Sequence, residues 1–281
     1  MMSQALRIFV ISLTRAAERR ASVSAHLQAL GLEYELVDGV DGRELPAEEH
    51  ARLLAPGVTF SSPGVVGCYM SHMAVYRRLV ETGDAAALVL EDDAALNPAI
   101  VPLLLAGPAR LDFDYCFLDC DNVREPVFYD PDARLPLGHG FTAYGLSGGP
   151  EGAHAVIVTR EAAAVRLSHG LPIQNAFDIY DMLPGRPRFA AILAPRGAGV
   201  AMTSLHSMIS SRREQTGPAF ASLRRQPWFP TLRDALRLRP VKGMLLRRRL
   251  QREGRLAAGP RWRLLPQGRE VLAQSAIRPV P

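Results

Sequence analysis

The chain has 281 residues, of which 48% are hydrophobic and 22% charged, with a net charge of +5. This composition excludes wholesale disorder and a fibrous repeat, and the length allows one large domain or one domain with an appendage. Three cysteines, Cys68, Cys116 and Cys120, are an odd number, which disfavours a disulfide framework and favours a reducing compartment. The sequence has no apolar run of the roughly 18–20 residues that span a membrane, and its N-terminus is a poor signal peptide.

The positive charge gathers near the C-terminus. Residues 212–255 hold 13 Lys and Arg against three acidic residues, a net charge of +10, whereas the rest of the chain carries −5. We therefore expect a globular domain at 1–211 and a basic, partly helical extension at 212–281.

The start of the chain predicts a strand, a helix and a second strand. Residues 6–12 are a short apolar run with β-branched side chains, which indicates a buried strand. Thr14 is placed to cap a helix that ends at Gly31. A strand at 34–37 follows and runs into a glycine-containing turn at 38–42. This order favours an α/β fold with a mixed, mostly parallel sheet and flanking helices.

Further along, Ser62 is placed as the cap and Pro63 as the first residue of a helix that is apolar on all sides and therefore buried. Residues 124–150 are rich in Pro and Gly, and we expect them to be irregular. The remaining predicted elements are strands at 86–90, 114–119, 153–159 and 189–193 and helices at 160–167 and 173–183.

The sharpest chemical feature is the run of carboxylates at Glu91, Asp92 and Asp93, directly after a predicted buried strand. Ligands of α/β sheets bind beyond the carboxyl ends of the strands. Adjacent carboxylates repel one another at neutral pH, and a bound Mg²⁺ or Mn²⁺ removes that repulsion. The alternative interpretation is a solvated acidic turn, or a helix cap at Asp93.

Four motifs follow one another along the chain, namely IFVISLTRAAERR at 8–20, VDGVDG at 37–42, GVVGCYMSH at 64–72 and LEDD at 90–93. They resemble the motifs of glycosyltransferase family 25, which includes bacterial lipooligosaccharide galactosyltransferases and collagen galactosyltransferases. Ser12 stands where Asn is usual in that family. The resemblance covers roughly residues 6–183 and is weaker after Asp119.

The resemblance implies a GT-A-like fold and an inverting, metal-dependent transfer of a hexose. The donor would be a UDP-sugar, usually UDP-galactose, and the acceptor a cell-surface glycan such as a lipopolysaccharide core. Asp93 would bind the metal directly, Glu91 would share the metal or contact the ribose, and His206 would complete the metal shell. A cation there stabilises the leaving diphosphate. His72 would contact the diphosphate or position the acceptor.

The expected donor-binding residues lie near the ends of the first three strands. Arginines in this region suit bidentate phosphate contacts, and the aspartates after the second strand either bond the ribose or serve turn chemistry. The full set is Ser12, Leu13, Arg15, Arg19, Asp38, Asp41, Glu91 and Asp92.

The catalytic base is open at this level. An inverting transfer needs a carboxylate to accept the proton of the acceptor hydroxyl. The family often has an acid where this chain has Gln174. Asp178 and Asp181 follow closely and are the first candidates, and Asp119 and Asp121 are their rivals.

The second hypothesis is a catalytically inactive relative that binds membrane surfaces or polyanions, motivated by Ser12, Gln174 and the basic extension. A phosphohydrolase is disfavoured because no carboxylate ends the first strand, and an oxidoreductase because no G-x-G-x-x-G follows a strand.

The extension interleaves arginines with apolar side chains over 212–255. Such a pattern predicts short amphipathic helices that lie on an anionic bilayer. We therefore expect a cytoplasmic protein with peripheral contact to the inner face of a bacterial inner membrane. Nucleic-acid binding is not expected, because no reading module accompanies the charge.

Overall fold

The computed structural model describes residues 5–58, 61–119, 127–180, 187–192, 200–202, 245, 247–252 and 261–265. The elements in chain order are β1 (Arg7–Ser12), α1 (Ala17–Ala29), β2 (Glu35–Asp38), α2 (Ala47–Leu53), α3 (Pro63–Thr82), β3 (Ala86–Glu91), β4 (Ala94–Leu96), the short 3₁₀ helix η1 (Pro98–Ile100), α4 (Val101–Ala106), β5 (Tyr115–Phe117), β6 (Phe128–Gly138), β7 (Phe141–Leu146), β8 (Ala155–Thr159), α5 (Arg160–His169), β9 (Phe189–Ile192), β10 (Val200–Met202) and β11 (Arg263–Leu264).

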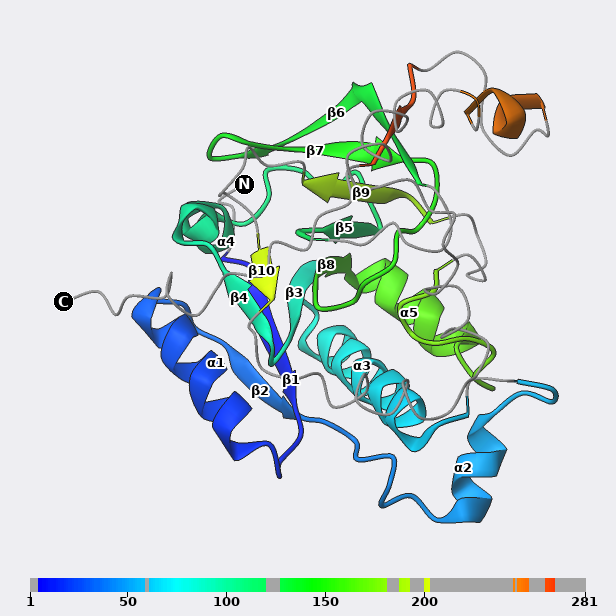
Figure 1. Ribbon diagram of the computed structural model, residues 1–281. Helices are drawn as coiled ribbons and strands as arrows, with labels where there is room; N and C mark the ends of the chain where they lie inside the picture. The colour runs from blue at the N-terminus through cyan, green and yellow to red at the C-terminus, as the bar shows by residue number, and fades with distance from the viewer. Residues whose placement is uncertain are drawn as a thin grey trace, which may run out of the picture.

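Within these residues one nine-stranded sheet runs through the molecule in the order β11-β6-β7-β9-β5-β8-β3-β1-β2 (Figure 1). Strands β2, β1 and β3 are parallel, as are β5 and β9. The other neighbours are antiparallel, because β8 runs against both β3 and β5 and a hairpin occupies the far side. The α/β class and the mixed sheet are confirmed, with more antiparallel pairing than the mostly parallel sheet we expected.

Side chains alternate across the sheet and build a core on each face. Phe9, Ile11 and Val89 pack with residues of α3 and α5 on one face. Ile8 and Val10 pack with residues of α1 and α4 on the other. The central strands are therefore buried on both sides, which explains their unbroken apolar runs in the sequence.

The predicted start of the long helix is confirmed, and that of the first helix is not. Ser62 Oγ accepts a hydrogen bond from Val65 N at 3.4 Å and caps α3, with Pro63 at its first turn. By contrast α1 begins after Ala16 with no side-chain cap. Ala16 N donates to Leu13 O, so a turn separates β1 from α1 and leaves the predicted cap, Thr14, exposed in that turn.

The segment expected to be irregular contains the hairpin β6–β7, so that expectation was wrong. Gly138, His139 and Gly140 all have positive φ and form the tight turn between the strands. The pairing shifts register between Tyr129 and Arg134 and again after Pro136. Such irregularities let a strand near a sheet edge contain the prolines that predict irregular structure in the sequence.

The predicted helix at 173–183 is also wrong for its described part, 173–180. Ile173 N donates to Leu53 O at 2.7 Å, and Ile173 O accepts from Ala55 N at 2.9 Å. This bridge to the end of α2 uses the backbone groups that a helix would need. Residues 181–183 lie outside the described chain.

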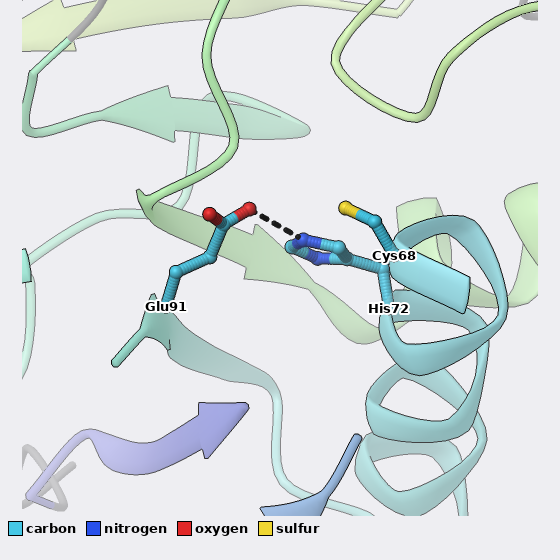
Figure 2. A group of neighbouring side chains, drawn as sticks. All are labelled: Cys68, His72 and Glu91. Atoms are coloured by element: carbon cyan, nitrogen blue, oxygen red, sulfur yellow. Dashed lines mark hydrogen bonds and ion pairs between the residues drawn. The ribbon is translucent and has the colours of Figure 1, made fainter. Parts of the chain in front are cut away.

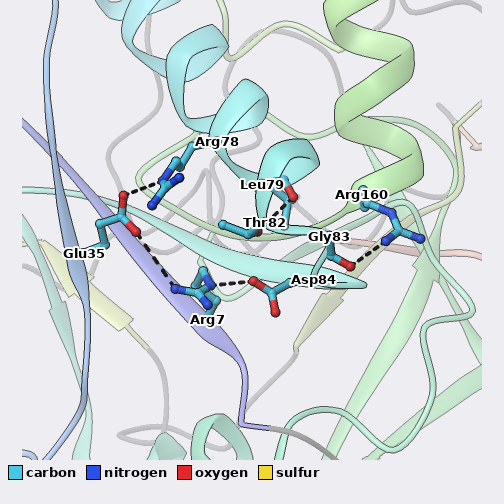
Figure 3. A network of polar contacts seen from close by, with 8 residues as sticks. All are labelled: Arg7, Glu35, Arg78, Leu79, Thr82, Gly83, Asp84 and Arg160. Atoms are coloured by element: carbon cyan, nitrogen blue, oxygen red, sulfur yellow. Dashed lines mark hydrogen bonds and ion pairs between the residues drawn. The ribbon is translucent and has the colours of Figure 1, made fainter.

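Ion pairs connect the strands at the sheet edge opposite the acidic triplet (Figure 3). Arg7 pairs with Glu35 and Asp84, and Arg78 Nε reaches Glu35 Oε1 at 2.8 Å. Arg160 donates to the carbonyl of Gly83, which ends α3 with φ of 76°. The arginines are well exposed, so these pairs contribute little to stability.

Part of the predicted C-terminal extension packs on the sheet. β11 pairs antiparallel with β6, Leu265 N donates to Val127 O, and the Leu265 side chain is buried in the core. Residues 247–252 are helical, as predicted for that stretch. The domain boundary at 211 stays a prediction. No helix in the described ranges is both long and apolar enough to cross a membrane.

Candidate functional site

One edge of the sheet gathers the polar residues of several strands. β1, β2 and β3 are parallel, so Ser12, Asp38 and Glu91 end at the same edge. β8 begins there because it runs antiparallel to β3, with Ala155 opposite Leu90. The end of β5 joins them, since Leu118 N donates to Ala155 O. This topology brings Asp119 and His154 close to the acidic triplet.

A cavity of about 360 Å³ opens at this edge. Its walls are the β1–α1 turn, the turn after β2, the first turns of α3 and the acidic end of β3. All four motif regions found in the sequence therefore meet in one cavity. It is lined by Ile11, Ser12, Leu13, Arg15, Ala16, Arg19, Gly39, Val40, Asp41, Gly42, Arg43, Ser62, Pro63, Gly64, Cys68, Ser71, His72, Glu91, Asp92 and Asp93.

The turn at 38–42 is held tightly against α3. Val40 N donates to Ser71 Oγ at 2.8 Å, and Ser71 Oγ donates to Gly67 O at 2.6 Å. A Cβ on Gly67 would lie 2.5 Å from Val40 O, and one on Gly42 would lie 1.8 Å from Pro63 O. Two glycines and one serine of the motifs thus fix this wall of the cavity, a structural role that sequence reasoning missed.

The three consecutive carboxylates have different surroundings. Asp92 accepts a hydrogen bond from Ser12 Oγ at 2.6 Å and pairs with Arg19. Asp93 Oδ2 lies 3.2 Å from Arg19 Nη2, while Asp93 Oδ1 is buried with no hydrogen-bond partner. Burial and the charge of Glu91 raise the pKa of Asp93 to about 6. Asp93 therefore carries the most poorly compensated negative charge of the three.

Glu91 and His72 form a pair inside the cavity. His72 Nε2 lies 3.2 Å from Glu91 Oε1, and the imidazole stacks on the Phe177 ring with centroids 4.2 Å apart. Burial alone would raise the pKa of Glu91, but the hydrogen bond with His72 and the nearby charges of His154 and Arg19 leave it lowered. Glu91 is thus held as a carboxylate. The contact with Phe177, far away in sequence, was not predicted.

A second His–carboxylate pair, His154 and Asp119, lies next to Glu91. His154 Nε2 is 3.0 Å from Asp119 Oδ2, and His154 O accepts from Glu91 N at 2.9 Å. Burial would lower the pKa of His154, but the hydrogen bond with Asp119 and the charges of Asp119, Glu91 and Asp93 raise it. The sequence predicted Asp119 as a candidate base but did not predict its histidine partner. His154 directly precedes β8, which pairs antiparallel with β3. Knowledge of this pairing would have placed His154 beside the acidic end of β3.

The arginines and aspartates of the turns pair with one another. Arg15 and Arg43 both contact Asp41 at the mouth of the cavity. Asp38 is 70% exposed, pairs with Arg20 at 2.8 Å and does not line the cavity. The turn contact belongs to Asp41, which accepts a hydrogen bond from Arg43 N at 3.2 Å.

Of the predicted site residues, the cavity brings together Ser12, Leu13, Arg15, Arg19, Asp41, His72, Glu91, Asp92 and Asp93. Asp178 is half-buried and does not line it. Asp181, His206 and Asp121 lie outside the described residues.

Two of the three cysteines are described. Cys116 is fully buried in β5, where burial raises the pKa of its thiol, so it packs in the core as expected. Cys68 is half-buried on α3 and lines the cavity. Cys120 lies outside the described residues.

The residues at the end of β3 fit a hard divalent cation. Such ions bind carboxylate oxygens, and Glu91 and Asp93 supply them on alternate residues of one strand end. The buried Asp93 Oδ1 atom has no hydrogen-bond donor, although a buried carboxylate oxygen normally has one. A cation would satisfy this atom and offset both the burial and the repulsion from Glu91 that raise the pKa of Asp93.

The N-terminal part of the chain resembles known glycosyltransferases. Residues 5–135 match the sequence model of glycosyltransferase family 25 (LPS biosynthesis protein). A family 25 member from Drosophila pseudoobscura pseudoobscura is 26% identical over 196 residues, which cover 63% of this chain and 29% of that protein.

The chain also resembles inactive members of glycosyltransferase family 25. The mouse inactive glycosyltransferase 25 family member 3 is 36% identical over 97 residues, covering 31% of this chain and 16% of that protein. The matches span less than a third of the length of these curated relatives. A solved glycosyltransferase involved in the glycosylation of the major capsid of PBCV-1 shares 12% identity and a TM-score of 0.35, covering 66% and 80% of the two chains.

The role of Arg19 gives a first prediction. Arg19→Gln should lower the free energy of unfolding by about 3 kcal/mol in metal-free buffer, because Asp92 and Asp93 lose their buried cation. Added Mn²⁺ should restore part of the loss. Urea denaturation with and without Mn²⁺ measures both effects. The matched control is Arg20→Gln, whose partner Asp38 is exposed and whose loss should stay below about 1 kcal/mol. Equal losses for the two variants would show that Arg19 does not hold the triplet together.

Proposed function

We propose that this chain is an inverting, metal-dependent glycosyltransferase that moves galactose from UDP-galactose onto a cell-surface glycan such as a lipopolysaccharide core. The observation that carries the proposal is the cavity that joins the four family motifs at the acidic end of β3. The match to the family model supports glycosyl transfer as the reaction class. Galactose, the acceptor and the metal rest on the resemblance and on the chemistry of the site.

Different residues of the cavity would bind different parts of the donor. Ser12 ends β1 and Leu13 follows it, where a nucleoside would lie, and the cavity-lining Arg15 is suited to bidentate phosphate contacts. The end of β3 would hold Mn²⁺ or Mg²⁺ through Glu91 and Asp93. When bound, that ion neutralises the charge that develops on the leaving diphosphate. His72, fixed by its contact with Phe177, is placed to contact the diphosphate.

Inversion also needs a base for the acceptor hydroxyl. Asp119 is a candidate that shares the sheet edge with Glu91 and is held by His154. Asp178 and Asp181, in the segment 173–183, remain candidates.

We predict that Asp119→Asn lowers kcat by about 10²–10⁴-fold while UDP affinity stays within twofold, because a base acts on the acceptor and not on the donor. Asp178→Asn is the parallel variant. Steady-state kinetics with titration of UDP separates the two effects. If Asp178→Asn loses turnover and Asp119→Asn does not, the base lies on the 173–183 segment.

Thermal denaturation with nucleotide sugars tests the proposed function directly. UDP-galactose with Mn²⁺ should raise the Tm of the wild type, whereas either one alone should do so less. UDP-glucose and UDP-N-acetylhexosamines test the choice of sugar. A Tm that no UDP-sugar moves, with or without Mn²⁺, would contradict the proposal.

A catalytically inactive relative is the second candidate, favoured by the similarity to inactive family members. The two candidates differ in turnover. An inactive relative binds polyanions without releasing UDP from UDP-galactose in the presence of Mn²⁺. Its sequence signals would be Ser12, whose hydroxyl bonds Asp92, and Gln174.

We further propose peripheral contact with the cytoplasmic face of a bacterial inner membrane through residues 212–255. The basis is the net charge of +10 interleaved with apolar side chains. Sedimentation with anionic vesicles should decrease as salt is added, and should fall when Arg224, Arg225, Arg233, Arg237 and Arg239 are changed together to Gln. Equal binding by the wild type and this variant would locate the contact elsewhere. Neutral vesicles are the control.

A further inference from the structure

Three side chains of different chemistry meet in the wall of the cavity. Cys68 and His72 lie four residues apart on α3, so they project from the same face of the helix. Glu91 approaches them from the end of β3. Figure 2 shows the thiol and the imidazole side by side on α3, both directed toward the Glu91 carboxylate. The sulfur, a ring nitrogen and a carboxylate oxygen all lie within 4.8 Å of one another.

This combination of ligands differs from that at Asp93. A hard cation such as Mg²⁺ or Mn²⁺ prefers oxygen ligands, whereas thiolate and imidazole select thiophilic ions, Zn²⁺ above all. Ligand atoms around a tetrahedral zinc lie about 3.4 Å apart, given bond lengths of about 2.0–2.3 Å. His72 Nε2 and Glu91 Oε1, at 3.2 Å, already have that separation. Only the Cys68 sulfur has to move closer.

The surroundings hold two of the three ligands in place. His72 stacks on Phe177, and the buried guanidinium of Arg166 also lies against this ring, 4.5 Å from its centroid. The Glu91 backbone is fixed by its hydrogen bond to His154 O. Cys68 is half-buried and borders the cavity, so an ion entering the cavity reaches its sulfur. Pre-positioned ligands of this kind raise metal affinity.

We propose that Cys68, His72 and Glu91 form a binding site for a thiophilic divalent cation, Zn²⁺ in particular, distinct from the hard-cation site at Asp93. The cavity side supplies the fourth position, which a water molecule fills. Zinc displaces the proton of the Cys68 thiol and takes the place of the hydrogen bond between His72 and Glu91.

The two sites share Glu91, and two divalent cations on one carboxylate repel each other, so zinc weakens the binding of a hard cation at Asp93. Zinc on the α3 side occupies the carboxylate that the Asp93 site needs. Zinc therefore acts as an inhibitor that competes with Mn²⁺ and the nucleotide sugar. This consequence rests on the proposed function, whereas zinc binding itself does not.

Metal binding to the full chain tests the site without any activity assay. The metal-free protein is titrated with Zn²⁺ against a chromophoric chelator, and with Co²⁺ to record the absorption of a thiolate–cobalt bond. Cys68→Ser should weaken Zn²⁺ binding by about 100-fold or more and abolish the cobalt–thiolate band, because outer partners alone already change affinity 10–100-fold. Mn²⁺ affinity, measured by electron paramagnetic resonance, should be unchanged.

Asp93→Asn is the matched variant. It should lose Mn²⁺ affinity and retain both Zn²⁺ affinity and the cobalt–thiolate band. Equal zinc affinity in wild type and Cys68→Ser would overturn the proposed site, as would a cobalt–thiolate band that survives in Cys68→Ser. If zinc binds as proposed but fails to compete with UDP-galactose and Mn²⁺, the site stands and the donor assignment of the cavity is contradicted.

Discussion

Asp93→Asn is expected to abolish sugar transfer, by about 100-fold or more, and at the same time to stabilise the metal-free protein. The first effect follows because the amide keeps the volume of the carboxylate but removes a charge that a divalent cation needs. The second follows because Asp93 is 3% exposed, lies beside Glu91 and keeps one oxygen with no hydrogen-bond partner. Burying that charge costs the native state free energy, and the variant does not bear this cost.

The stabilisation should depend on pH in a defined direction. The pKa of Asp93 is raised from 3.8 to about 6 in the folded chain, so ionising it costs folding free energy. The cost is complete above pH 6 and absent below pH 4. The free energy of unfolding of Asp93→Asn should therefore exceed that of the wild type by about 1–3 kcal/mol at pH 7.5. The two values should converge toward pH 4. Denaturation in the presence of a chelator at several pH values measures this difference.

Asp92→Asn is the control for both effects. Asp92 accepts a hydrogen bond from Ser12 and pairs with Arg19, so its amide should destabilise the fold at pH 7.5. Near-normal turnover of Asp93→Asn would contradict its role with the metal. If Asp93→Asn has a lower free energy of unfolding than the wild type, Arg19 fully compensates the charge of Asp93.

Local signals predicted the central strands and the long helix because each is decided by a few residues near in sequence. The apolar run of β1, the cap at Ser62 and the acidic end of β3 are of this kind. Pairings between strands that are far apart in the sequence were harder to predict. The hairpin β6–β7 is stabilised by neighbours in the sheet, and its prolines and glycines are accommodated at register shifts that no local pattern reveals.

The same distinction explains the site. The motif residues that line the cavity were predicted because they follow strand ends and resemble the motifs of glycosyltransferase family 25. His154 and Phe177 were missed, although His154 O accepts a hydrogen bond from Glu91 N and Phe177 stacks on His72. Each reaches it only through the topology, His154 through the antiparallel pairing of β8 with β3 and Phe177 through a segment that bridges to α2.

Gly67→Ala is expected to destabilise the protein, against the usual effect of this substitution in a helix. Within a helix alanine is favoured over glycine by about 1 kcal/mol. Here the new Cβ would lie 2.5 Å from Val40 O and 2.6 Å from Gly42 N. Both neighbours are backbone atoms, so no side-chain rotation relieves the contact, and the turn at 38–42 has to move away from α3. Overpacking of this kind costs about 1–3 kcal/mol or more.

The displacement should also weaken donor binding, because the moving turn includes the cavity wall at Val40 and Asp41. It pulls Val40 N away from Ser71 Oγ, now 2.8 Å apart, and shifts the carboxylate that holds Arg15. Urea denaturation and calorimetric titration with UDP measure the two effects. Gly145→Ala is the control, since its Cβ would meet Ala133 Cβ at an ordinary 3.4 Å. If Gly67→Ala folds and binds UDP as well as Gly145→Ala does, the contact between the turn and α3 does not form this wall of the cavity.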